Sequence, residues 1–166
     1  MKDNNKSKLS QILGAFEANR AAAKKETDRL KTEHELFLEA FAEKARSVIR
    51  PAMEDVAEQL RAGGHGAAIV EQLETRDDQG HAHNAGITLS MFPLGEKPGY
   101  PNEHDCPHVA VMANAHSNSV YVHESTMMHG RGGHAGGAGE YLLEQISTDL
   151  VEQHILKVLS EAMGTP

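Results

Sequence analysis

Apolar residues recur at helical spacing through the first third of the chain, where helix breakers are rare. Residues 7–62 contain one proline and one glycine and are rich in Ala, Glu, Lys, Arg and Leu, which favour helix. The pattern predicts one long helix kinked near Pro51, because proline has no N–H to bond to the preceding turn. Gly63 and Gly64 are expected to end this helix with a left-handed cap.

The two halves of this helix differ in apolar pattern. From Phe37 onward, apolar residues follow three or four positions apart, which is typical of a helix buried along one face. Between Glu17 and Glu35 the only larger apolar residue is Leu30, so Phe16, Ala23, Leu30 and Phe37 follow a seven-residue spacing without a regular second apolar position. A coiled coil has two apolar positions per heptad. Residues 1–36 are therefore predicted to be a helical arm or a weak coiled coil, with these four residues at its interface, and residues 37–166 a head domain.

After the two glycines the apolar period changes to two, which indicates strands. Four short strands are predicted, at residues 67–76, 86–92, 108–115 and 119–124. Their connections are rich in Asp, Gly and Asn and need no helix, so the simplest arrangement is a four-stranded antiparallel meander. The link 93–107 holds four prolines and is expected to be a structured surface loop.

The C-terminal part begins with a glycine-rich stretch. Six of the ten residues in 130–139 are glycine, which predicts a flexible linker. Residues 140–163 then return to helical spacing with a broad apolar face. The predicted class is α+β, with this last helix and the second half of the first helix packed on one face of the sheet.

Composition narrows the classes of protein. The chain has 166 residues, a formal charge of −8 and one cysteine, so nucleic acid is an unfavoured partner and no disulfide framework is expected. No stretch approaches the roughly 20 apolar residues of a membrane span, and no secretory leader is evident. The sequence predicts a cytoplasmic protein with no membrane contact.

Charge is distributed unevenly. Residues 1–31 carry eight Lys or Arg and four acids, a balance of +4, whereas the remaining residues carry 8 against 20, a balance of −12. A basic N-terminal end could contact an acidic partner or, less favourably, phosphates. The alternative is an ordinary solvated helix surface.

Histidine is the most over-represented residue type with metal-binding chemistry. Nine of the eleven histidines lie between His65 and His134. In a meander, the first and third turns fall at the same end of the sheet, so His81, His83 and His116 (the three-histidine group) could converge on a zinc ion. A second set, His104, Cys106 and His108, belongs to the other end. The competing interpretation is that all are solvated loop histidines, and no cofactor is expected.

Two further motifs resemble chemical sites but lack the context that the chemistry requires. Cys106 lies between two histidines, but neighbours along the chain do not form the spatial dyad that a cysteine nucleophile needs. Gly130 to Ala135 matches the loose pattern G-x-G-x-x-A, but no second parallel strand follows it.

The sequence therefore favours a small non-enzymatic interaction or adaptor protein that self-associates, as a dimer, or docks onto another protein through its long N-terminal helix. A helix of about 55 residues spans about 80 Å, longer than a domain of this mass. A histidine-based metal-binding or metal-sensing protein is the first alternative. A small enzyme with an unrecognised site is the second.

Overall fold

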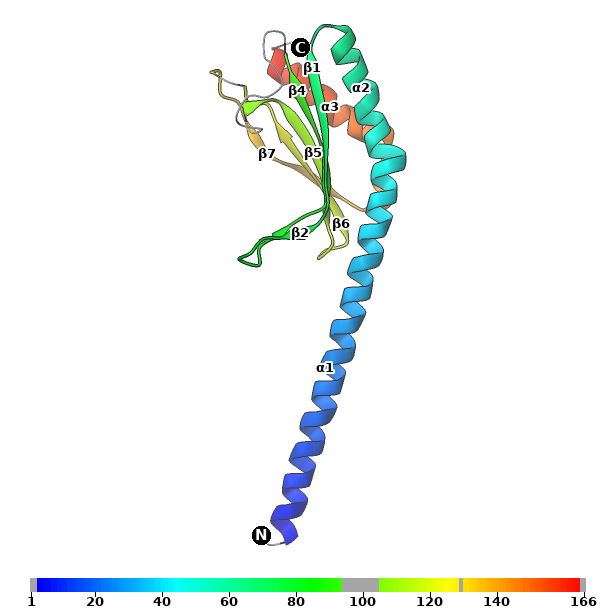
Figure 1. Cartoon of the computed structure of the whole chain (residues 1–166), viewed down its shortest axis with the longest axis vertical. Coiled ribbons are helices and arrows are strands. Elements are labelled where there is room, and N and C mark those ends of the chain that lie inside the picture. Colours follow the sequence, from blue (N-terminus) through cyan, green and yellow to red (C-terminus); the bar gives the residue numbers. More distant parts are fainter. Residues whose placement is uncertain (1–2, 94–104, 129, 165–166) are drawn as a thin grey trace. The chain divides into compact units, whose positions relative to one another are not determined.

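The computed structural model describes residues 3–93, 105–128 and 130–164, except the side chain of Asp3. The chain divides into two compact units, Met1–Leu36 and Phe37–Pro166. The described part of the first unit is helical and belongs to α1 (Asp3–Lys44). The second unit contains the rest of α1, a five-stranded antiparallel sheet and a C-terminal helix, so the class is α+β as predicted (Figure 1). No helix among the described residues is long and apolar enough to cross a membrane.

Helical backbone continues from α1 through η1 (Ala45–Ile49), a π-helical turn, into α2 (Arg50–Ala62). The wide turn lies directly before Pro51, where the sequence predicts a kink. Arg50 N–H bonds to Ala45 O, five residues back, instead of four. A π-turn moves the carbonyls that an ordinary helix would aim at the proline ring, so the helix passes Pro51 without breaking in two.

The glycine cap of α2 forms as expected. Gly63 N–H bonds to Gln59 O at 3.0 Å, and His65 N–H bonds to Leu60 O at 2.9 Å. Gly64 takes a φ of 83°, a left-handed conformation that side chains disfavour. The chain thereby leaves the helix and enters the first strand.

The main sheet is an antiparallel meander in which every strand pairs with its neighbour in the order β1-β4-β5-β6-β7. Its strands are β1 (Gly66–Gln72), β4 (Gly86–Phe92), β5 (His108–Asn114), β6 (Ser119–Ser125) and β7 (Ala135–Tyr141). Between β1 and β4 the chain forms a separate two-stranded ribbon of β2 (Thr75–Arg76) and β3 (Ala82–His83). The strand predicted over 67–76 is therefore divided between β1 and β2.

The fifth strand corrects the prediction of a flexible linker over 130–139. Residues 135–139 belong to β7 and pair with β6, with an irregularity between Val122 and His123. The Tyr141 ring folds back over Gly139, and a Cβ there would meet the ring at 2.7–2.8 Å. Glycine at this position makes room for an aromatic neighbour on a strand, instead of supplying flexibility.

The C-terminal helix begins later than predicted. Residues 140–141 complete β7, a short 3-10 turn η3 (Leu143–Gln145) follows, and α3 spans Thr148–Met163. Ser147 caps α3, because its side chain accepts a hydrogen bond from Leu150 N–H at 3.2 Å. The prediction of helix from residue 140 was wrong because it followed apolar spacing through Leu143 and overlooked this cap.

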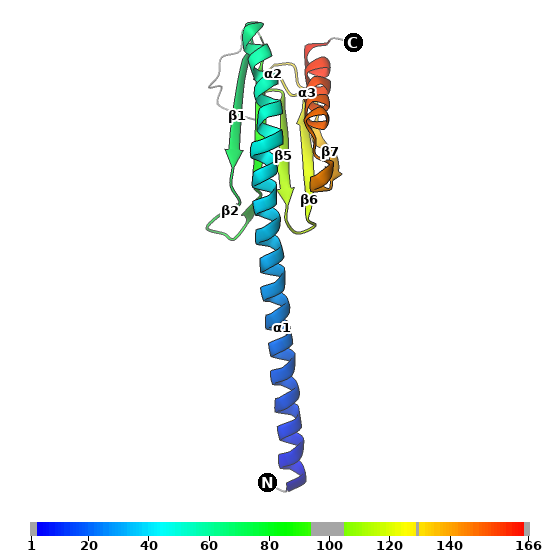
Figure 2. The same cartoon turned by 90° about the vertical axis from the view of Figure 1, so that its right-hand side faces the viewer.

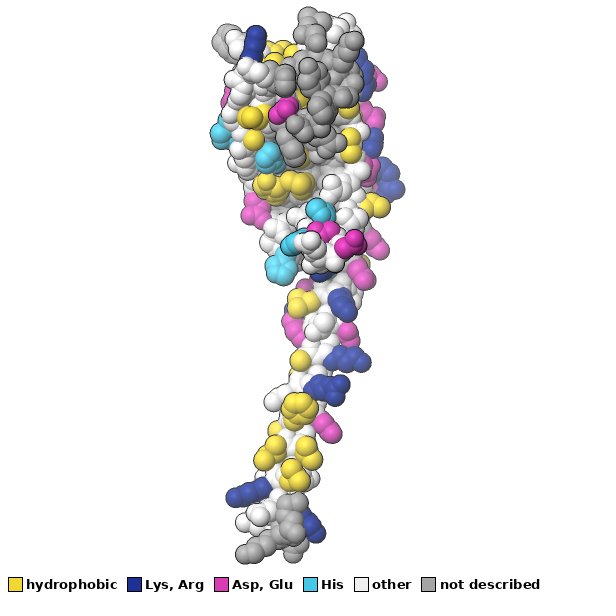
Figure 3. Space-filling view, turned by 60° about the vertical axis from the view of Figure 1, so that its left-hand side comes forward, with side chains coloured by type: hydrophobic (Ala, Val, Ile, Leu, Met, Phe, Trp, Pro, Cys, Tyr) yellow, Lys and Arg dark blue, Asp and Glu magenta, His cyan; other side chains and the backbone are white. Residues whose placement is uncertain are grey.

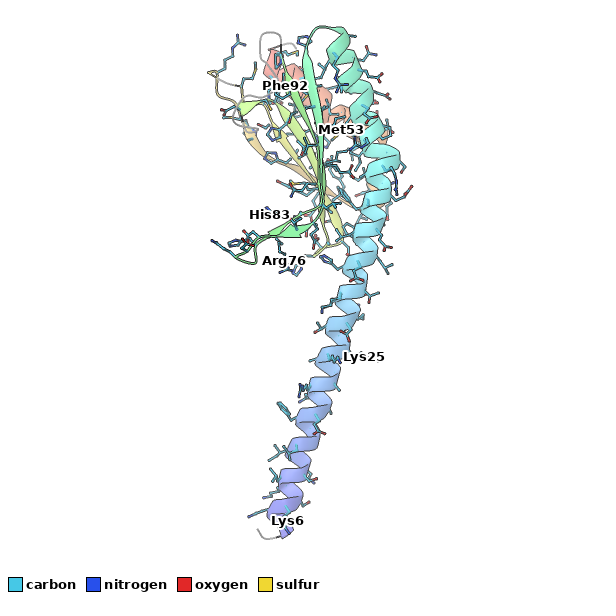
Figure 4. All side chains as sticks on the ribbon, viewed as in Figure 1. Lys6, Lys25, Met53, Arg76, His83 and Phe92 are labelled. Carbon is cyan, nitrogen blue, oxygen red and sulfur yellow. The ribbon has the colours of Figure 1, made fainter. Side chains whose placement is uncertain are left out.

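One face of the sheet is covered by α2 and α3, which lie next to each other (Figure 2). Core residues alternate along the strands, with Ile87, Leu89 and Met91 of β4 all buried. Met53 of α2 (Figure 4) is also fully buried against this face. Ile155 of α3 is fully buried in the same core. The expected packing of the helices on one side of the sheet is what the structure shows.

Candidate interaction surface

The first unit exposes large apolar side chains along its helix. Phe16 is 64% exposed and Leu30 52% exposed. Ala23, between them, is also exposed. Every seventh residue returns to within about 20° of the same direction around a helix, so the three lie on one face. Three of the four predicted interface residues are therefore open to solvent.

Phe37, the fourth predicted interface residue, has a different environment. It belongs to the second unit, is half-buried, and packs against the hydrophobic core of that unit together with Leu38. Its contribution to an interface would be limited to the part of the ring that the core leaves exposed.

Sequence reasoning missed the apolar residues nearest the N-terminus. Leu9, Ile12 and Leu13 are all exposed, and with Phe16 they follow the spacing i, i+3, i+4, i+7 of one helix face. Figure 3 shows hydrophobic side chains gathered on this end of α1. The signal was readable in the sequence, but only the seven-residue repeat was followed. We call Leu9, Ile12, Leu13, Phe16, Ala23 and Leu30 the apolar face of α1.

An ion-pair network stabilises the helix beside this face. Arg29 donates hydrogen bonds to Glu26, one turn earlier, and to Glu33, one turn later. The hydrogen bonds that Arg29 donates to Glu26 raise the pKa of the Arg29 guanidinium, and the same contact lowers the pKa of the Glu26 carboxyl. These bonds lie within one helix, so they support the helical conformation and leave the apolar face uncovered.

The three-histidine group is brought together only in part. His81 Nδ1 lies 2.9 Å and His83 Nε2 4.0 Å from the same oxygen, Asp77 Oδ2. The side chain of Asp77 also accepts the backbone N–H of His81, which is the main reason why its pKa is lowered. His83 is on the β2–β3 ribbon (Figure 4), and His116 is in the turn between β5 and β6.

No set of three His, Cys, Asp or Glu side chains able to hold a metal is found within residues 3–93, 105–128 and 130–164. Zinc binding by the three-histidine group stays a prediction. In the second set, His104 lies outside the described residues, as does most of the predicted 93–107 loop. Cys106 is buried, and His108 Nδ1 bonds to its carbonyl oxygen at 3.0 Å.

A buried polar cluster joins the sheet to α3. Glu124 of β6 is 7% exposed and points towards the helices. His154 Nδ1 lies 2.5 Å from Glu124 Oε1, and Lys157 Nζ donates to Glu124 Oε2 at 2.6 Å. The far nitrogen of His154 lies 2.9 Å from the Tyr141 hydroxyl. Because a carboxylate only accepts, His154 carries a proton on Nδ1.

The electrostatics of this cluster follow from its contacts. Burial alone would raise the pKa of the Glu124 carboxyl, but the hydrogen bonds from Lys157 and His154 outweigh burial and hold it below the ordinary value. The bond to Glu124 raises the pKa of Lys157. Every group has a partner suited to its charge, so the cluster serves to fasten α3 to β6 and β7.

The opposite face of the sheet carries a shallow groove of about 320 Å³. Thr88, Ser90 and Met112 line it, together with His108 and His123, whose rings stack with centroids 5.4 Å apart. Histidine side chains are visible on this face in Figure 3. The groove presents hydroxyl and imidazole groups to a ligand. Residues 94–104, which connect β4 to β5 along the chain, lie outside the described residues.

Neither a protein-family model, nor a curated protein, nor a solved structure matches this chain.

Proposed function

We propose that this protein is a non-enzymatic interaction protein that self-associates through the apolar face of α1. The observation that supports the proposal is the exposure of six apolar residues within about 100° of the helix circumference, in a unit that contains no other element among its described residues. Large apolar side chains gathered on one face are the usual mark of a contact site.

Helix stability gives a second reason for a partner. Isolated helices in water are marginal, since tertiary packing of an apolar face supplies most of their stability. Within residues 3–36, the apolar face of α1 has no such packing inside its own unit. A second copy of the chain presents the same face, so one contact would stabilise two helices at once.

The free energies of apolar burial and of association predict a dimer of moderate affinity. Burying Phe16 and Leu30 from both copies would contribute about 1.5–3 kcal/mol for each of four side chains, or about 6–12 kcal/mol in all. Association costs about 4–15 kcal/mol in lost freedom of motion. The two ranges overlap, so Leu9, Ile12 and Leu13 decide the balance, and we expect a dissociation constant in the micromolar range.

Sedimentation equilibrium of the full chain between about 5 and 200 μM tests the proposal. We expect a monomer–dimer equilibrium that Leu30→Glu weakens at least tenfold, because burial of a leucine exceeds the roughly 1.4 kcal/mol that a factor of ten requires. Ala21→Glu is the matched control, because it adds the same charge about 160° around the helix from Ala23. A wild-type chain that stays monomeric, or an equal effect of both variants, would contradict the proposal.

A further inference from the structure

The apolar repeat of α1 is symmetric about Ala23. Phe16 and Leu30 lie seven residues before and after it, and Leu9 and Phe37 lie fourteen residues before and after it. When a second helix runs in the opposite direction with its own Ala23 at the same level, Phe16 of each copy meets Leu30 of the other. Ala23, the smallest residue of the repeat, is then level with Ala23 of the second copy. A small side chain at this point permits close approach of the two helices.

Charge has the same symmetry with reversed sign. Residues 2–14 carry three lysines and one aspartate, a balance of +2, and residues 32–44 carry four glutamates and one lysine, a balance of −3. Reversal about Ala23 brings these two windows level with each other. A parallel pair would instead place each window beside its own copy, which is unfavourable for both.

Single charges nearer the centre agree with the reversed direction. Arg20 and Glu26 lie three residues on either side of Ala23, and Glu17 and Arg29 lie six residues on either side. In an antiparallel pair each charge is level with an opposite charge of the second copy. In a parallel pair each is level with an identical one.

From this pattern we infer that α1 pairs with a second copy of itself in antiparallel orientation, with Ala23 at the twofold axis. The inference rests on the self-association proposed above and adds its direction and register. The contact is isologous, so it closes at two copies.

Single cysteines placed by substitution test the direction, in a chain whose only native cysteine has been removed as Cys106→Ser. The three informative sites are Ala23→Cys, Leu30→Cys and Phe16→Cys. The matched control is Ala21→Cys, on the far side of the helix. Chains are mixed under reducing conditions, equilibrated, and then oxidised in a glutathione buffer.

The antiparallel register predicts that Ala23→Cys cross-links with itself at least about a hundredfold faster than Ala21→Cys. The pair holds the two Ala23→Cys thiols against each other at a millimolar effective concentration, whereas the two Ala21→Cys thiols lie on its outer sides. A mixture of Phe16→Cys and Leu30→Cys chains should give the mixed disulfide. Leu30→Cys alone should not cross-link, because its two copies would lie about 21 Å apart along the pair, too far for a disulfide.

Two results would overturn the inference in distinguishable ways. Self-linking of Leu30→Cys and of Phe16→Cys, without the mixed product, would show a parallel pair, so that the direction is wrong and self-association stands. Cross-linking of Ala23→Cys no faster than Ala21→Cys, together with a monomeric Cys106→Ser chain in sedimentation, would remove the proposed self-association as well.

Discussion

Replacing Glu124 with glutamine removes the charge at the centre of the buried cluster and keeps the shape of the side chain. The carboxylate accepts hydrogen bonds from His154 and Lys157, and glutamine has only one oxygen with which to accept. The side chain of His154 is 12% exposed, so it has little access to water as a substitute partner, whereas Lys157 is 56% exposed and does. Most of the lost stability should therefore come from the hydrogen bond between His154 and residue 124.

A hydrogen bond to a charged group contributes about 1.5–3 kcal/mol, and leaving a buried donor without its partner adds to the loss. We expect Glu124→Gln to lower the free energy of unfolding by about 2–3 kcal/mol at pH 7, which corresponds to about 4–12 °C in melting temperature. Lys157→Met is the matched comparison and should lose less than Glu124→Gln, because His154 still donates to Glu124 in that variant.

The assay is urea unfolding followed by tyrosine fluorescence. The chain has no tryptophan and three tyrosines, none before residue 100, so the signal reports the second unit and not residues 1–36. Linear extrapolation gives the free energy of unfolding, and an unchanged slope shows that both variants expose the same surface. A loss below about 0.5 kcal/mol for Glu124→Gln, or an equal loss for Lys157→Met, would refute the reasoning.

The same pair of proteins gives a pH dependence with a defined sign. The pKa of Glu124 is lower in the folded chain than its ordinary value of 4.5, so its contribution is complete above that value and is lost as the pH falls through the folded pKa. The pKa of Lys157 is raised from 10.5, so its share is lost as the pH rises through the higher folded value. The difference between wild type and Glu124→Gln should be flat near neutrality and shrink in acid; a difference that grows below pH 4 would contradict it.

Three further outcomes are expected. Ile155→Ala empties a fully buried site of α3 and should cost about 2–5 kcal/mol in urea unfolding, whereas Leu156→Ala, on the exposed side of the same helix, should change stability by less than about 0.5 kcal/mol. Gly14→Ala should increase the helical circular dichroism signal, because no atom blocks a Cβ there and alanine favours helix by about 1 kcal/mol; an unchanged signal would show that this turn is already fully helical. Elemental analysis of the purified protein should find no stoichiometric zinc. Stoichiometric zinc that disappears when the three-histidine group is substituted would contradict this expectation.

The strands that sequence predicted best are those with alternating side chains. In β4, Ile87, Leu89 and Met91 face the core while Thr88 and Ser90 face away, so a period of two was visible. The strand β7 offered no such pattern, because glycine has no side chain to alternate. Its pairing with β6 depends on backbone hydrogen bonds and on the Tyr141 ring over Gly139, which composition does not reveal.

The candidate interaction surface was predictable in part because it depends on spacing within one helix. The seven-residue repeat identified Phe16, Ala23 and Leu30. The neighbouring i, i+3, i+4 pattern would have added Leu9, Ile12 and Leu13. Phe37 packs against the core of the second unit. This contact is a tertiary property, which the spacing of apolar residues along the chain does not show.

The buried cluster lay beyond sequence reasoning for a similar reason. Glu124 and His154 are 30 residues apart, and their contact requires both the inward register of β6 and the position of α3 on the sheet. An acidic residue that continues the inward alternation of Val120 and Val122 was the only visible sign. It did not identify the partner.

Amide hydrogen exchange of the full chain at about 5 and about 200 μM tests the central claim most directly, because it locates any protection along the helix. Self-association through the apolar face of α1 predicts that residues 9–30 exchange more slowly at the higher concentration, while the strands of the sheet exchange at the same rate at both. Rapid exchange of residues 9–30 that does not change with concentration would contradict it.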